Sequence, residues 1–178
     1  MKEISIFIFT LLMTLKIQGQ GLIDKYPEIK TAKVKIDQND SLKIIKLENE
    51  EFLENMTDGG GELKGFYDFT GTVRKIEVTI FISHGVQEYV FYLREETPFF
   101  IDDKFKQFAW NEETSTLDYD RFDGGFHGTY IFREGYLIDQ ISLGHNRFED
   151  DQVSIEETFK SECENYLEKI KKRLANKG

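Results

Sequence analysis

Apolar and polar side chains alternate along several stretches of this chain, and short turn signals separate the stretches. The clearest stretch is residues 73–83 (VRKIEVTIFIS), in which isoleucine or valine occupies every second position from 76 to 82. The same pattern recurs in residues 87–94 (QEYVFYLR), 125–133 (GFHGTYIFR) and 136–143 (YLIDQISL). A period of two is that of a half-buried β-strand, and a turn as short as Glu134–Gly135 joins antiparallel neighbours. The sequence therefore predicts an antiparallel sheet built of hairpins.

The last part of the chain has the periodicity of a helix. From Ser154 onward the apolar residues are spaced three or four apart, at Ile155, Phe159, Cys163, Tyr166, Leu167, Ile170 and Leu174. This spacing forms a stripe along one side of an α-helix. Ser154 is a suitable N-cap, and acidic residues precede basic residues along the helix, which suits its dipole. The predicted fold is therefore α+β, with this long C-terminal helix packed on the apolar face of the sheet.

The N-terminal part of the chain carries mixed signals. Residues 22–38 favour a helix with Pro27 in its first turn, although AKVKI within them also alternates like a strand. Residues 41–47 predict a short strand, and residues 49–56 predict one or two helical turns. A further strand is expected in residues 98–110, where Pro98 restricts it to a sheet edge or to the start of the strand. We expect a single domain, residues 20–178, with a smaller helical element at its N-terminus.

Three consecutive glycines, Gly59 to Gly61, raise the question of a phosphate-binding loop. A P-loop ends in a lysine and a hydroxyl residue that enter a helix, whereas the strand-like residues 63–69 follow here. A dinucleotide-binding fingerprint needs a strand–glycine–helix unit, and this stretch does not have that pattern. We interpret the glycines as the entry to a hairpin whose turn is Thr70–Gly71.

Residues 1–19 have the pattern of a secretory signal peptide. Lys2 precedes an apolar run from Ile4 to Leu15, and Gly19 offers a small residue before the expected cleavage point. The run is too short to cross a bilayer as a mature helix, and no cysteine lies near it for a lipid anchor. We therefore expect a periplasmic or secreted protein that is not a lipoprotein, with no membrane insertion after signal removal.

Charge and cysteine usage restrict the partners. The chain has 33 acidic and 23 basic residues, a net charge of −10 at pH 7. A surface this acidic repels phosphate backbones, so no nucleic-acid partner is expected. The single cysteine, Cys163, has no second cysteine for a disulfide and is interpreted as a small buried apolar residue.

The densest group of polar residues is GHNRFEDD (144–151), in the expected loop before the last helix. It contains His145, Asn146, Arg147, Glu149, Asp150 and Asp151. One interpretation is a general base or a cation site, because loops on rigid scaffolds carry function. The other is structural, with the aspartates favouring the N-terminus of the following helix and Arg147 paired with an acid.

A second acidic stretch, DYDRFDGG (118–125), is similar to a calcium-binding loop. Asp118 and Asp120 match the start of the EF-hand pattern, but Asp123 falls one position late and Thr129 stands where the last glutamate belongs. The two interpretations are an acidic turn and a weak calcium site made of Asp118, Asp120 and Asp123. Calcium is the one cofactor that the sequence suggests.

Three motifs together resemble a known group of proteins. They are NEEFLENMTDGGGEL (49–63), GFYDFTG-x-x-x-KI (65–76) and GHNRFEDD before the C-terminal helix. With the signal peptide, these motifs make most of the mature chain similar to a family of uncharacterised exported proteins of Bacteroidetes bacteria. The resemblance implies export and a single domain, and it implies no activity.

Two functional hypotheses follow from these features. No catalytic motif is recognised and aromatic residues make up 14% of the chain, so the first is a non-enzymatic binding or inhibitor-like domain. It holds a protein, a peptide or a glycan on an open sheet face where Phe81, Tyr92 or Tyr130 is exposed. The second is a small hydrolase or metal-assisted enzyme centred on the GHNRFEDD loop. A deep pocket that contains His145 and a carboxylate favours the enzyme, and a flat aromatic face favours binding.

Overall fold

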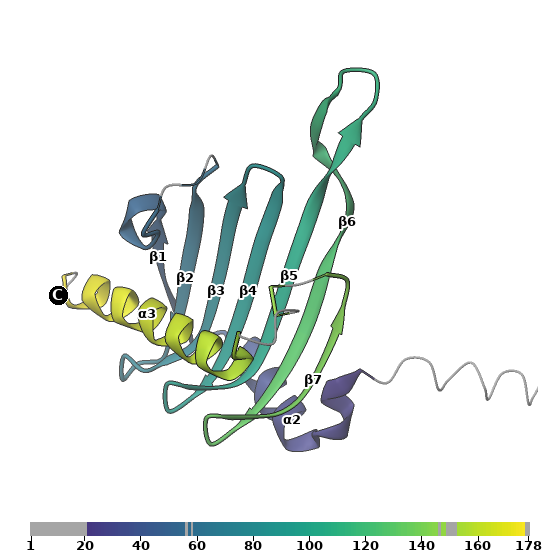
Figure 1. The fold of residues 1–178 in the computed structure, drawn as a ribbon. Coiled ribbons are helices and arrows are strands. Elements are labelled where there is room, and N and C mark those ends of the chain that lie inside the picture. Colours follow the sequence, from purple (N-terminus) through teal and green to yellow (C-terminus); the bar gives the residue numbers. More distant parts are fainter. Residues whose placement is uncertain (1–20, 56, 58, 146, 149–152, 177–178) are drawn as a thin grey trace, which may run out of the picture.

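The computed structural model describes residues 21–55, 57, 59–145, 147–148 and 153–176. The predicted signal peptide, residues 1–19, lies outside the described residues. In the part that is described, helices lie on both faces of a single sheet (Figure 1). None of these helices has both the length and the apolar character that a membrane crossing requires.

Within the described residues, seven strands form one antiparallel sheet in which each strand pairs with the next along the chain. They are β1 (Lys43–Glu48), β2 (Gly61–Tyr67), β3 (Val73–Ile82), β4 (Gly85–Arg94), β5 (Thr97–Asn111), β6 (Thr116–Arg133) and β7 (Tyr136–Leu143). The predicted sheet of hairpins is confirmed. Pro98 lies at the start of β5, and β5 is an interior strand between β4 and β6.

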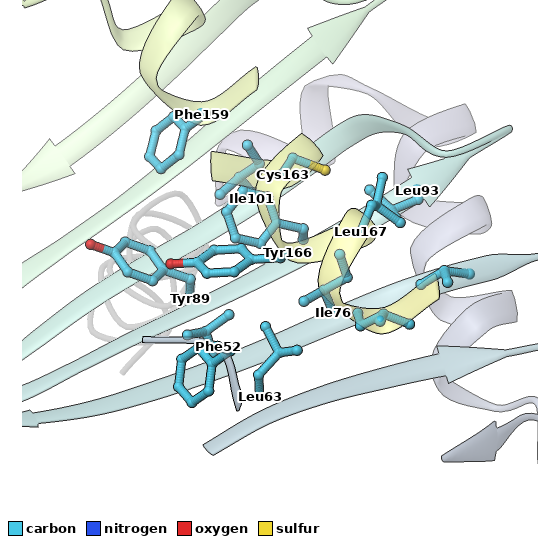
Figure 2. Close-up of a cluster of buried hydrophobic side chains, with 14 of the residues drawn as sticks. Phe52, Leu63, Ile76, Tyr89, Leu93, Ile101, Phe159, Cys163, Tyr166 and Leu167 are labelled. Carbon is cyan, nitrogen blue, oxygen red and sulfur yellow. The ribbon is translucent and has the colours of Figure 1, made fainter. Parts of the chain in front are cut away.

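The C-terminal helix α3 (Ile155–Ala175) crosses one face of the sheet, as predicted (Figure 1). Ser154 caps it, since its side chain accepts a hydrogen bond from the backbone N–H of Glu157. Figure 2 shows the resulting core, in which Phe159, Cys163, Tyr166 and Leu167 of the helix face Ile76, Tyr89 and Ile101 of the sheet. Burial raises the pKa of the Cys163 thiol to about 12. Cys163 is therefore a buried apolar residue, as predicted.

The opposite face of the sheet is partly covered by the N-terminal helices η2 (Leu22–Lys25) and α2 (Pro27–Asp37). Their apolar side chains form a second core with aromatic residues of the sheet, made of Leu22, Ile29, Tyr92, Phe99, Phe100 and Ile131. Pro27 occupies the first turn of α2, where its missing N–H costs nothing. The predicted N-terminal helix is confirmed and the strand alternative is wrong. The helical turn η3 (Asn49–Glu51) is shorter than expected.

The three glycines are needed because their backbone packs closely against its neighbours. Gly60 has a φ of +68°, and a Cβ there would collide with the side-chain oxygen of Asn49. A Cβ on Gly61 would lie 2.6 Å from the carbonyl oxygen of Thr79 on β3. Asn49 Oδ1 also accepts a hydrogen bond from the Gly61 N–H. The glycines therefore lead the chain into β2, as predicted.

Candidate functional site

The three aromatic residues predicted for an open sheet face lie in different environments. Tyr130 faces α3 and is 1% exposed, and Tyr92 lies beneath α2 and is 5% exposed. The Tyr92 hydroxyl donates a hydrogen bond to the Asp37 carboxylate at the end of α2, at 2.9 Å. Phe81 alone among the three is exposed, at 42%. The expected exposure of Tyr92 and Tyr130 is therefore wrong, because a helix covers each of them.

On the sheet face that α2 partly covers, the part that α2 leaves open across the central strands is charged. The Asp102 carboxylate on β5 pairs with Lys104 and lies 2.6 Å from His127 Nε2 on β6. Lys106 pairs with Glu88 on β4 at 2.7 Å. These interactions, within β5 and between neighbouring strands, keep the middle of the face polar. An aromatic binding surface is therefore restricted to the end of this face that contains Phe81.

At that end lies a concave apolar site of about 530 Å³, which we call the aromatic groove. It is lined by Gly59, Phe81, Ile82, Ser83, Val86, Phe108, Tyr119 and Phe122. The Phe108 and Phe122 rings are stacked, with centroids 5.5 Å apart, and the Tyr119 ring meets Phe108 edge-on at 5.0 Å. Phe81, Tyr119 and Phe122 are exposed, so the groove presents aromatic surface to solvent.

The groove exists because β5 and β6 continue past the rest of the sheet as a twisted hairpin (Figure 1). The pairing of β5 with β6 shifts register on both sides of Phe108. Such bulges bend a strand and redirect its side chains. Gly125, with a φ of +141°, allows β6 to approach the Phe105 carbonyl oxygen, where a Cβ would collide. The bend places Tyr119 and Phe122 over Phe108.

The acidic residues of the proposed calcium loop lie in this hairpin. Asp118, Asp120 and Asp123 belong to strand β6, so the interpretation as an acidic turn is wrong. The Asp118 carboxylate accepts a hydrogen bond from the backbone N–H of Asp120. Within the described part of the chain, no three histidine, cysteine, aspartate or glutamate side chains are grouped so that they could hold a metal ion. The three aspartates instead contribute negative charge beside the aromatic groove.

The GHNRFEDD loop is described at His145, Arg147 and Phe148, whereas Asn146, Glu149, Asp150 and Asp151 lie outside the described residues. The Arg147 guanidinium forms two hydrogen bonds to the Glu162 carboxylate on α3, one of them at 2.8 Å. It also lies over the rings of Tyr89, Phe148 and Phe159, 4.8 to 5.3 Å from their centroids. The prediction that Arg147 pairs with an acid is confirmed. This pair attaches the loop to α3.

His145 and Arg147 also line a small cavity of about 190 Å³ on the α3 face, which we call the polar cavity. Its other lining residues are Ile82, His84, Gln87, Asp103, Phe105 and Phe126. Asp103 is 2% exposed, whereas His84 and His145 are exposed. The Gln87 side-chain N–H₂ donates to Asp103 Oδ1 at 2.6 Å and to the Lys104 carbonyl at 2.9 Å. Burial raises the pKa of the Asp103 carboxyl to about 6, against a smaller opposing effect of Arg147.

Sequence reasoning missed Asp103 and Gln87. The signal was present in the alternation of β5, because Asp103 shares its face with Ile101 and Phe105, which point toward α3. A carboxylate at an inward position of an alternating strand is uncommon, since burying a charge is costly. Sequence alone did not show which of the adjacent residues Asp102 and Asp103 faces the core.

No protein-family model, curated protein or solved structure matches the chain. The described residues thus offer two candidate sites, the aromatic groove on one face and the polar cavity on the other.

Proposed function

We propose that this chain is an exported binding module, periplasmic or secreted, that holds a basic peptide segment of a partner protein in the aromatic groove. The observation that supports this most strongly is the cluster of exposed rings at one end of an otherwise ion-paired face. Phe81, one of the residues that the sequence suggested for binding, is part of that cluster.

The size and composition of the groove suit a few apolar anchors of a peptide. Its volume of about 530 Å³ falls within the range of about 300–1,000 Å³ that is usual for ligand sites. Aromatic side chains supply large contact areas and dominate binding energy at interfaces. Contiguous exposed apolar surface rimmed by polar residues is typical of interaction sites. The stacked Phe108 and Phe122 rings form a preorganised floor, which limits the entropy cost of binding.

The charge around the groove favours a basic partner. Residues 106–125 of the extended hairpin contain five acidic and two basic residues, a net charge of −3. Charge of one sign steers ligands of the opposite sign toward a site. Lys106 already places its ammonium group 5.9 Å from the centroid of the Phe122 ring. This intramolecular contact supports a cationic ligand, because it is of the kind that a basic side chain of the partner would make with the other rings.

The test uses the mature chain, residues 20–178, and three labelled peptides. One alternates lysine and phenylalanine, the second has glutamate in place of lysine, and the third has alanine in place of phenylalanine. Fluorescence anisotropy should show binding of the first peptide only, with weaker binding at high salt because the charges are exposed. Equal binding of the glutamate peptide would contradict the proposal.

Two variants locate the binding site. Tyr119→Ser and Phe122→Ser should each weaken the lysine–phenylalanine peptide by about tenfold, as expected for an aromatic hot spot. Tyr136→Ser is the matched control, because Tyr136 is 65% exposed and Tyr119 is 66% exposed, and Tyr136 lies at the start of β7. If Tyr136→Ser weakens binding as much as Tyr119→Ser does, the groove is not the site.

A second candidate function is a small hydrolase that uses the polar cavity. The supporting observation is that His145, Asp103 and His84 line one cavity, because imidazole and carboxyl groups are common general acids and bases in hydrolases. Nitrophenyl esters and phosphates, assayed with the mature chain between pH 5 and pH 8, test this function. Turnover that His145→Ala abolishes and Tyr119→Ser preserves would support it. Turnover that both variants preserve would exclude the cavity as its source.

A further inference from the structure

The polar cavity contains a buried carboxylate whose cationic neighbour is already paired with a second acid. Asp103 on β5 is buried and lines the cavity. The positive charge of Arg147 stabilises the ionised form of this carboxylate. Arg147 already forms two hydrogen bonds to Glu162. When all three are ionised, their charges sum to −1. Because Arg147 interacts with both Asp103 and Glu162, an ammonium group that enters the cavity gains a buried carboxylate as an additional partner.

The neutral polar groups of the lining also favour a hydrogen-bond donor. Gln87 uses its side-chain N–H₂ on Asp103 Oδ1 and on the Lys104 carbonyl. Its remaining polar atom is the amide oxygen, which can only accept. Asp103, when ionised, likewise offers acceptors alone. A ligand that brings several N–H donors therefore complements these groups better than an anion does.

The apolar part of the lining is mostly aromatic, and the cavity is small. Phe105 and Phe126 face the same side of the sheet as Asp103, and the His84 ring lies 5.3 Å from the Phe105 ring. Aromatic faces attract ammonium groups, most strongly where water is excluded. A volume of about 190 Å³ is about six times the volume of a water molecule in the liquid. This accommodates a group of a few heavy atoms.

We propose that the polar cavity binds a small primary ammonium ion, held by the Asp103 carboxylate and the Gln87 amide oxygen against the Phe105 and Phe126 rings. The site adjoins the proposed peptide groove at Ile82, which lines both, but the two open on different faces of the sheet, because Asp103 and Phe105 face α3 whereas Val86 faces the other side. The inference therefore does not depend on the proposed function. It assigns to the chain a ligand of a different chemical class.

Binding of an ammonium ion at this site depends on pH through Asp103. Several titratable or charged groups surround this carboxylate. The neighbouring strands and α3 contribute Tyr89, Tyr130, Tyr166 and Glu162. The loops contribute Arg147, His145 and His84, and Asp102 is adjacent on β5. The tyrosines remain neutral over the pH range of the test, since burial raises the pKa of Tyr89, Tyr130 and Tyr166. Protonation of Asp103 removes the charge that attracts the ligand.

The test titrates the mature chain with n-butylamine hydrochloride by calorimetry, at constant ionic strength kept with potassium chloride. 1-Butanol serves as the neutral control of the same size. With an Asp103 pKa of about 6, the ionised fraction falls about tenfold between pH 7.5 and pH 5, and the affinity for n-butylamine should fall by about the same factor. Binding of 1-butanol with equal affinity, no heat of binding for n-butylamine, or a pH-independent affinity would each overturn the proposal.

Two variants separate a specific site from general attraction to an acidic protein. Asp103→Asn should abolish n-butylamine binding at pH 7.5. Asp102→Asn, which removes a carboxylate from the opposite face of the same strand, should preserve it. Equal loss in both variants would show that net charge and not the cavity attracts the amine. If Asp103→Asn does not fold, Gln87→Ala replaces it, because this variant removes the other proposed contact and should weaken n-butylamine binding while Asp102→Asn does not.

Discussion

The buried Asp103 carboxylate should make the stability of this protein depend on pH in an unusual direction. Its pKa is about 6 in the folded chain, against an ordinary value of 3.8 for an aspartate. The folded state therefore binds a proton more tightly than the unfolded state does. Stability from this group is fully present below pH 3.8 and is lost as the pH rises through 6. Most carboxylates act in the opposite direction.

The magnitude follows from the difference between the two pKa values. One pKa unit corresponds to about 1.4 kcal/mol, so the free energy of unfolding should fall by about 2–3 kcal/mol between pH 4 and pH 7 because of Asp103 alone. For a chain of this length, that corresponds to a decrease in Tm of about 5–10 °C. Asp68 opposes this trend, because hydrogen bonds from Thr70 and Arg74 lower the pKa of its carboxyl to about 2.

The assay compares Asp103→Asn with the unaltered chain, so that the other titrating groups cancel. Thermal unfolding is followed by circular dichroism at half-unit steps from pH 4 to pH 8. The difference in Tm between the two proteins should change by about 5–10 °C across this range, with the variant gaining relative to the parent as the pH rises. A difference that stays constant with pH, or that changes in the opposite sense, would refute the buried, proton-binding Asp103.

Three further predictions concern the fold. Ile170→Ala should lower the free energy of unfolding in urea by about 2–5 kcal/mol, because Ile170 is fully buried. The control is Ile141→Ala at an exposed position of β7, which should lower it by under about 1 kcal/mol. Tyr92→Phe should lower the free energy of unfolding by about 1 kcal/mol. It should also raise the pKa of Asp37, because the carboxyl loses a hydrogen bond that favours its ionised form. An unchanged titration of the Asp37 carboxyl by NMR would contradict this. Gly60→Ala should lower the Tm, since Gly60 has a φ of +68° and lacks room for a Cβ; an unchanged Tm would show that this turn can rearrange.

Much of the architecture was predictable from local patterns. The period of two in residues 73–83 and the turn at Glu134–Gly135 specify antiparallel hairpins, because they depend on neighbours in the chain. The apolar stripe of residues 155–174 specifies a helix that needs an apolar face to cover. These signals led to the observed sheet and to α3 across it.

The candidate sites were predictable only in part. The sequence identified Phe81, His145 and Arg147, but it did not show that Phe81 lies beside Tyr119 and Phe122 in one groove. Strand β6 begins at Thr116, nine residues before the predicted strand at 125–133. The acidic and glycine-rich residues before position 125 resemble a loop by composition. Pairing with β5 overrides that preference, and it continues along the hairpin as far as Asn111 and Thr116.

By itself, the sequence determined the type of most elements, the antiparallel order of the hairpins and the apolar side of the last helix, because these depend on residues close together in the chain. Only the tertiary structure decided that α2 covers Tyr92, that α3 covers Tyr130 and that Asp103 is buried at the base of a cavity. Exposure and pKa depend on what packs against a side chain, and those contacts come from segments far apart in the sequence. Alternation shows that a strand has two faces, and the packing of the helices decides which residues on each face remain open to a ligand.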